Sequence, residues 1–108
     1  MSRQWELQRM GVLRLSDYFQ IVSPVGGLYE MDKRSLKLLL EMHGKSTNSN
    51  IENYTHEEIE EFALFAEEET LLKGKSITEE IEAPFNISQV IQNLDNDNIK
   101  MLTYRPDY

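Results

Sequence analysis

The stretch from residue 17 to residue 44, DYFQIVSPVGGLYEMDKRSLKLLLEMHG, most narrows the folds open to this chain. Tyr18 to Val22 is aromatic and β-branched, and Leu28 to Met31 resumes the apolar pattern after a break. Between them, Pro24 fixes φ and two adjacent glycines can adopt positive φ, which is turn chemistry. The stretch therefore predicts a β-hairpin over residues 18–31, although it does not say which face of the second strand is buried.

An amphipathic helix is expected directly after the hairpin. Asp32 fits an N-cap, because its carboxylate can accept from a free N–H of the first turn. The apolar stripe of this helix, predicted over residues 33–43, consists of Leu36, Leu39, Leu40 and His43. Gly44 is the expected stop. We interpret His43, in the last turn, as a packing residue rather than as a metal ligand or a catalytic base.

The strongest helix signal lies further on, at residues 55–72. Thr55 and Glu58 form a capping box, in which each side chain bonds the backbone N–H of the other residue. Ile59, Phe62, Ala63 and Ala66 supply the apolar stripe. Glu67, Glu68 and Glu69 crowd the C-terminal end, where negative charge opposes the helix dipole. This triplet is either a solvated acidic patch or an acidic surface kept for a basic partner.

The remaining segments carry weaker signals. Residues 76–83 remain ambiguous, because Ser76 and Glu79 could form a capping box while Pro84 limits any helix to about two turns. The others are listed in chain order: a short helix at 3–10, an extra strand at 12–15 that would extend the hairpin to a three-stranded meander, a mobile polar loop at 45–53, a helix at 87–94 that starts at Asn86, a strand at 99–104 and a tail at 105–108.

Length and charge limit the class of protein. A chain of 108 residues is expected to form a single domain. It has no cysteine and no apolar run of membrane-spanning length, so a cytoplasmic protein without a membrane partner is expected. The formal charge is −8, with a net +2 on residues 1–45 and −10 on residues 46–108. This sign makes nucleic acid an unlikely partner, because phosphate contacts need a broad basic face.

No pattern in the chain indicates catalysis. His43 and His56 lack the spacing of a zinc motif, and the acidic turn at residues 95–98 lacks the glycine and the closing glutamate of a calcium loop. Exposed helix glutamates have no pocket to separate their pKa values. The expectation is a protein that is not an enzyme, with no catalytic residues, no metal and no cofactor.

One family resemblance adds to this interpretation. Residues 28–32 and 35–40, followed by His43 and Gly44, resemble the strand–helix core of the peptide-recognition element, the family of the pyrroloquinoline quinone peptide chaperone. The resemblance implies a small antiparallel sheet before winged-helix-type helices, and a leader peptide that adds as a strand at the sheet edge. That edge would be residues 28–31, flanked by the helix at 55–72. The polar segment 45–53 departs from the family, which has a helix there.

The expected function is binding of another protein or peptide, through a sheet edge and an acidic helix face. The predicted partner-binding residues are Leu28, Tyr29, Glu30, Met31, Glu58, Glu61, Phe62, Phe65 and Glu68. The strand at 12–15 or the one at 99–104 could instead cover the sheet edges. The alternative function is a small acidic inhibitor, such as an immunity protein or a phage-encoded blocker, that covers a basic surface of a nuclease, toxin or other host protein.

The predicted fold class is α+β. Short hairpin links with helices segregated after the strands favour an antiparallel sheet of two or three strands, followed by three to four helices. The expected core is Phe19, Ile21, Leu36, Leu39, Leu40, Ile59, Phe62, Ala66, Val90, Ile91 and Leu94.

Overall fold

Two antiparallel sheets and three helices make up the computed structural model, which describes residues 3–15, 18–47, 49–95 and 103–104. The fold is α+β, as predicted. In chain order the elements are β1 (Arg3–Leu7), β2 (Gly11–Leu15), β3 (Tyr18–Val22), β4 (Leu28–Met31), α1 (Lys33–Met42), α2 (His56–Glu68), β5 (Leu72–Ser76), α3 (Ile87–Asp95) and β6 (Thr103–Tyr104).

The larger sheet has the strand order β4-β3-β2-β6. The predicted hairpin is confirmed, with Ile21 opposite Tyr29, and so is the strand before it, which places Val12 opposite Ile21. Of the predicted strand at 99–104, the described part is β6, which pairs with β2. Residues 99–102 and the predicted tail at 105–108 lie outside the described residues.

The second sheet pairs β1 with β5 and corrects the predicted helix at residues 3–10. Residues 3–7 form a strand rather than part of a helix, because Trp5 and Leu7 alternate with more exposed neighbours and are both buried. On its other side, β1 is covered by the start of the predicted loop: the Trp5 N–H donates to the Lys45 carbonyl at 3.1 Å. The N–H of Thr47 donates to the Arg3 carbonyl at 2.9 Å.

Helix α2 ends earlier than predicted, at Glu68, because the chain turns sharply into β5. The Leu71 N–H donates to the Ala66 carbonyl at 2.8 Å and the Thr70 N–H to the Glu67 carbonyl at 3.2 Å. This pair of bonds is a Schellman motif, which normally places glycine at the residue with positive φ. Here that residue is Thr70, with φ of 61°.

The helix starts agree with the sequence signals. Asp32 accepts from the Ser35 N–H at 2.8 Å, and both bonds of the Thr55–Glu58 capping box are present. Asn86 accepts from the Gln89 N–H at 3.1 Å at the start of α3. Gly44, with φ of 79°, follows the C-cap of α1.

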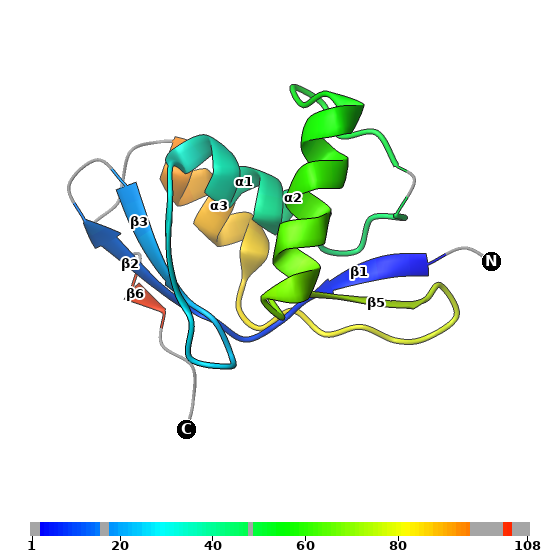
Figure 1. Cartoon of the computed structure of the whole chain (residues 1–108), viewed down its shortest axis with the longest axis horizontal. Helices are drawn as coiled ribbons and strands as arrows, with labels where there is room; N and C mark the ends of the chain where they lie inside the picture. Colours follow the sequence, from blue (N-terminus) through cyan, green and yellow to red (C-terminus); the bar gives the residue numbers. More distant parts are fainter. Residues whose placement is uncertain (1–2, 16–17, 48, 96–102, 105–108) are drawn as a thin grey trace.

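One core joins both sheets, because α1 packs against β1, β3 and β4. Figure 1 shows the two sheets toward opposite ends of the molecule with the three helices gathered on one side of them. Most of the predicted core is buried, but Phe62 and Ile91 are only partly so, since each also lines an open groove. Buried residues that were not predicted are Trp5, Leu7, Met10, Val12, Met31, Leu38, Met42, Ile51, Ala63, Leu71 and Leu72.

Candidate functional site

The two faces of β4 differ in exposure. Met31 is 5% exposed and Tyr29 is half-buried, whereas Leu28 is 63% exposed and Glu30 lies in solvent. The Tyr29–Met31 face therefore packs on the core, which the hairpin pattern alone left open. Met31, one of the predicted partner-binding residues, therefore has its side chain in the core.

The backbone of β4 presents an open edge. The Ser23 N–H donates to the Gly27 carbonyl at 2.8 Å, so Gly27 is turned toward β3. Backbone groups alternate in direction along an antiparallel strand, so those of Leu28 and Glu30 point away from β3. Within the described residues, no strand pairs with this edge and no hydrogen bond ends on those outward groups. The strand at residues 11–15 covers β3 and leaves β4 at the end of the sheet.

Aromatic contacts tie β4 to α2. The Tyr29 ring meets the Phe65 ring edge-on, with centroids 5.3 Å apart and planes at 88°, and Phe65 lies 5.9 Å from Phe62. The Tyr29 hydroxyl donates to the Glu69 carboxylate, and this hydrogen bond raises the pKa of the phenol. The predicted strand and the predicted helix are thus brought together at Tyr29.

A groove continues from this contact between α1 and α2. It has a volume of about 320 Å³ and is lined by Arg34, Ser35, Leu38, Tyr54, Glu58, Glu61, Phe62 and Phe65. Four of the predicted partner-binding residues share it: Glu58, Glu61, Phe62 and Phe65. Glu68 is exposed and lies on the same face of α2, since positions 61, 65 and 68 follow helical spacing.

The positive charge in the groove is already engaged. The Arg34 guanidinium donates to both oxygens of Glu58, at 2.9 and 3.1 Å, and to the Asn53 carbonyl at 2.8 Å. It also lies 4.4 Å from the centre of the Tyr54 ring. The hydrogen bond from Arg34, with the Thr55 N–H, lowers the pKa of Glu58. This cluster joins the start of α2 to α1, and no local pattern in the sequence predicts it.

The glutamate triplet at the end of α2 is divided between structural and exposed roles. The Trp5 indole N–H donates to Glu67 at 3.0 Å, and Glu69 accepts from Tyr29. These two glutamates link α2 to the smaller and the larger sheet respectively. Glu68, between them, is exposed and has no described partner, so the triplet as a whole is not one free acidic patch.

The outer edge of β5 is partly capped by the protein's own side chains. Gln8 N–H donates to the Leu71 carbonyl, so alternation turns the backbone groups of Gly74 and Ser76 outward. The Arg3 guanidinium caps the Gly74 carbonyl at 2.8 Å, and the Glu79 carboxylate accepts from the Ser76 N–H at 3.2 Å. The ambiguous segment after β5 therefore starts as a turn that ends the strand, not as a helix.

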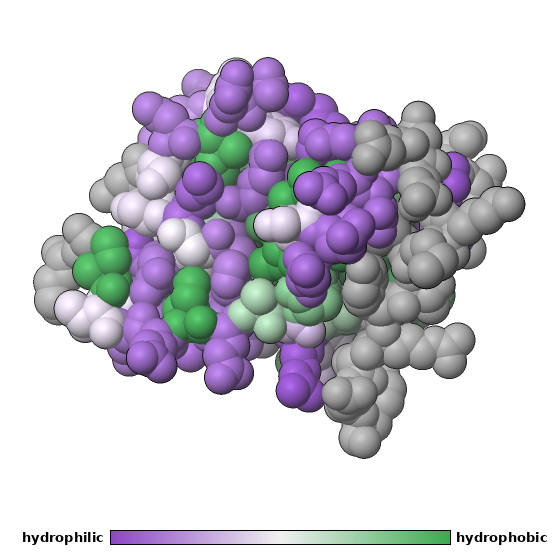
Figure 2. Space-filling model, turned by 180° about the vertical axis from the view of Figure 1, so that it is seen from behind, coloured by the Kyte–Doolittle hydropathy of each residue, from purple (hydrophilic) through white to green (hydrophobic). Residues whose placement is uncertain are grey.

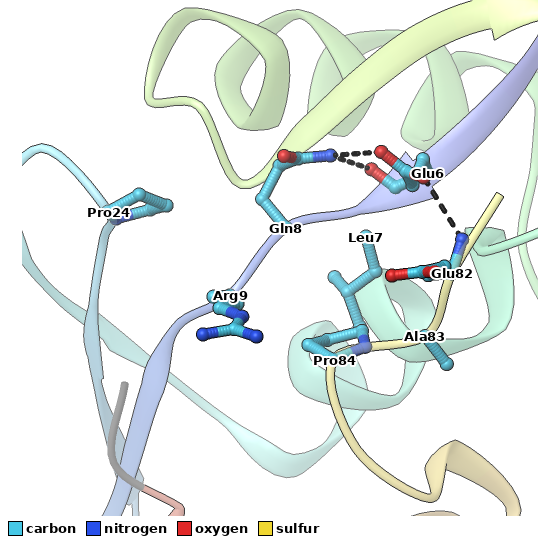
Figure 3. Close-up of a pocket in the computed structure, with 8 residues that line it drawn as sticks. All are labelled: Glu6, Leu7, Gln8, Arg9, Pro24, Glu82, Ala83 and Pro84. Carbon is cyan, nitrogen blue, oxygen red and sulfur yellow. Dashed lines mark hydrogen bonds between the residues drawn. The ribbon is translucent and has the colours of Figure 1, made fainter. Parts of the chain in front are cut away.

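A second pocket, of about 330 Å³, lies where the chain crosses from one sheet to the other (Figure 3). The Glu6 carboxylate there accepts from Gln8, from the Glu82 N–H at 3.0 Å and from Lys75 at 3.0 Å. Burial alone would raise the pKa of Glu6, but these hydrogen bonds outweigh it and lower the pKa to about 2. A carboxylate with this many partners is suited to holding β1, β5 and the segment at Glu82 together rather than to proton transfer.

The histidine interpretation is supported by the contacts of His43. Its Nδ1 accepts from the Leu7 N–H at 3.0 Å, and burial lowers its pKa, so the neutral ring bonds β1. Among the described residues there is no group of three or more side chains suited to a metal ion. None of the described helices is both long and apolar enough to span a bilayer.

Comparisons with protein-family models, with curated proteins and with solved structures found no match. The β4 edge, helix α2 and the groove between α1 and α2 are therefore the features that bear on function.

Proposed function

We propose that this protein is a non-enzymatic binding module that takes up an extended peptide segment of another protein as an additional strand on β4. The observation that carries the proposal is the difference between the two sheet edges. Side chains cap the Gly74 carbonyl and the Ser76 N–H on the outer edge of β5, whereas the outward groups of Leu28 and Glu30 on β4 have no described partner. An edge with unpaired N–H and C=O groups is a template for strand addition.

The neighbourhood of β4 supports a specific site rather than a bare edge. Phe65 and Glu69 contact Tyr29, so α2 borders the strand, and the groove toward α1 begins at the same place. The resemblance to the peptide-recognition element implies that a peptide adds to this same strand and is flanked by this same helix. On the face seen in Figure 2, the hydrophobic side chains outside the grey residues form small separate groups, which offer no broad apolar docking surface.

A second copy of this chain is a poorer occupant than a foreign peptide. Pairing β4 with another β4 would bring two copies of Glu30 onto adjacent strands and two acidic α2 helices toward one another. Like charges on paired strands are destabilising. A peptide without this negative charge avoids the repulsion.

The acidic inhibitor remains a second candidate, favoured by the exposure of Glu57, Glu60, Glu61 and Glu68 on α2. It is weakened by the engagement of Glu58, Glu67 and Glu69 within the protein. Salt separates the two functions. Binding driven by surface charge is largely lost at several hundred millimolar salt, while main-chain hydrogen bonds persist.

The proposal is tested with a displayed library of random twelve-residue peptides selected against the full chain. Amide exchange is then measured by NMR with and without a selected peptide. We expect the amides of Leu28 and Glu30 to become protected, and those of Gly74 and Ser76 to stay unchanged. Failure to select any peptide, or bound peptides that leave Leu28 and Glu30 unaltered, would overturn the proposal.

A further inference from the structure

One carboxylate in the groove between α1 and α2 is uncompensated. Glu58 is paired with Arg34, whereas Glu61 lines the same groove without an ion pair or hydrogen bond to any described residue. Glu68 lies two helical turns further along the same face and is likewise exposed. The groove therefore has a local excess of negative charge that the protein itself does not balance.

Part of the groove wall is apolar. Leu38 is buried at its base, and the rings of Phe62 and Phe65, both half-buried, lie 5.9 Å apart along α2. A side chain that fits an apolar wall ending in a carboxylate has a hydrocarbon stem and a positive end, as lysine and arginine do. Aromatic faces add an attraction for the cation itself.

An anionic side chain does not suit the groove. Its one guanidinium, that of Arg34, already bonds Glu58 and the Asn53 carbonyl and lies over Tyr54. A carboxylate or phosphate entering the groove would have to displace these contacts and would also meet Glu61. The charge balance thus selects for a cation.

We infer that this groove is the specificity subsite for a lysine or arginine of the bound peptide segment. The inference rests on the proposed strand addition at β4. The stem of the basic side chain lies along Phe62 and Phe65, and its charged end pairs with Glu61. Glu68 extends the negative potential toward the β4 edge.

The position of the subsite fixes where the basic residue falls in the peptide. Met31 ends β4 and Asp32 caps α1, so Arg34 and Ser35 at the groove wall follow the strand within one helical turn. The basic residue therefore lies at the end of the added segment that is nearest Met31. The opposite end, near Leu28, has no such requirement.

The experiment compares selected peptides with versions in which each lysine or arginine is replaced by methionine. We expect selection on the wild-type chain to enrich lysine or arginine at one position. Replacement there should weaken binding about three- to fivefold, as expected for a pair of exposed charges. Glu61→Gln should weaken binding of the basic peptide by a similar factor and remove the difference between the two peptides.

Glu60→Gln is the matched control. It makes the same charge change on the same helix, but Glu60 pairs with His56 and does not line the groove. The control should leave the preference for the basic peptide intact. Raising NaCl from about 50 mM to about 500 mM should weaken binding of the basic peptide. Binding of its methionine version should stay nearly unchanged.

The outcomes separate this inference from the proposal on which it rests. Peptides that protect the Leu28 and Glu30 amides but show no basic position, or that bind Glu61→Gln as well as wild type, overturn the cation subsite alone. If no peptide binds the β4 edge, the strand-addition proposal fails and the subsite inference fails with it.

Discussion

The outer edges of β4 and β5 present the same backbone groups and differ in what meets them. On β5, the guanidinium of Arg3 bonds the Gly74 carbonyl and the carboxylate of Glu79 bonds the Ser76 N–H. On β4, no described side chain does so, and the strand instead borders two aromatic rings and a groove. The difference teaches that edge protection in this fold is assigned strand by strand, through charged side chains from nearby turns and strands.

The largest expected loss of stability comes from a substitution in β1, because β1 holds β5 in place. Trp5 is 3% exposed and its indole bonds Glu67. Trp5→Ala should lower the free energy of unfolding by about 3–5 kcal/mol, measured by urea denaturation. Trp5→Phe keeps most of the buried ring and should cost clearly less. If Trp5→Ala unfolds at the wild-type urea concentration, β1 does not anchor the smaller sheet.

The next largest change in stability depends on pH and tests the contacts of Glu6 with β5 and with the segment at Glu82. The folded-state pKa of Glu6, about 2, lies below its ordinary value of 4.5. Its ionised form therefore stabilises the fold above about pH 5, and this contribution is lost as pH falls toward 2. Glu6→Gln should cost about 1–3 kcal/mol at pH 7, since solvent screens part of the interaction.

The same Glu6→Gln variant should approach wild-type stability by pH 2, as followed by urea denaturation across the pH range. Glu80→Gln, an exposed glutamate of the turn after β5, is the charge-matched control and should keep the wild-type pH dependence. A constant difference between Glu6→Gln and wild type at all pH values would contradict the role assigned to Glu6.

Removing the side chains that cap β5 should leave its outer edge as exposed as that of β4. Arg3→Ala combined with Glu79→Ala removes both caps and should cost about 1–2 kcal/mol. It should also produce concentration-dependent association, seen by analytical ultracentrifugation. Lys73→Ala is the control, because Lys73 is exposed and its backbone faces β1. A double variant that stays as monomeric as wild type would show that other features protect β5.

The smallest expected effect on stability concerns β4 itself. Glu30→Pro removes one outward N–H without touching the ladder to β3, so the free energy of unfolding should change by less than about 1 kcal/mol. Peptide binding should nevertheless be lost, by isothermal titration. Tyr29→Pro removes an inward N–H and should destabilise the fold more strongly. Unimpaired binding by Glu30→Pro would place the peptide elsewhere.

Sequence reasoning succeeded where the signal was local. Pro24 with two glycines predicted the hairpin, and the Thr55–Glu58 pair predicted the start of α2, because each depends on neighbours within a few residues. It failed for β1, whose partner lies more than sixty residues away. The alternation of Trp5 and Leu7 was the available signal, but a five-residue run is too short to separate strand from helix without its partner.

For the candidate site, the sequence predicted individual residues but not the contacts between them. Tyr29, Phe62 and Phe65 were named from strand and helix patterns, yet their contact across the site was not derivable from spacing. Met31 was named as part of the strand edge and its side chain lies in the core, because alternation does not say which face of a strand is buried. Arg34 was missed as a site residue because its pairing with Glu58 spans two helices and a loop.

The pairing of β1 with β5 also sets an order of events during synthesis. Arg3 caps the carbonyl of Gly74, which lies 71 positions further along the chain. β1 therefore leaves the ribosome long before its partner strand exists. The hairpins and α1 depend on local contacts, which form faster than such distant ones. β1 is thus expected to pair with β5 only after the hairpin and α1 have formed. Because Trp5 is the one tryptophan of the chain, its fluorescence during refolding should report this closing step separately from helix formation.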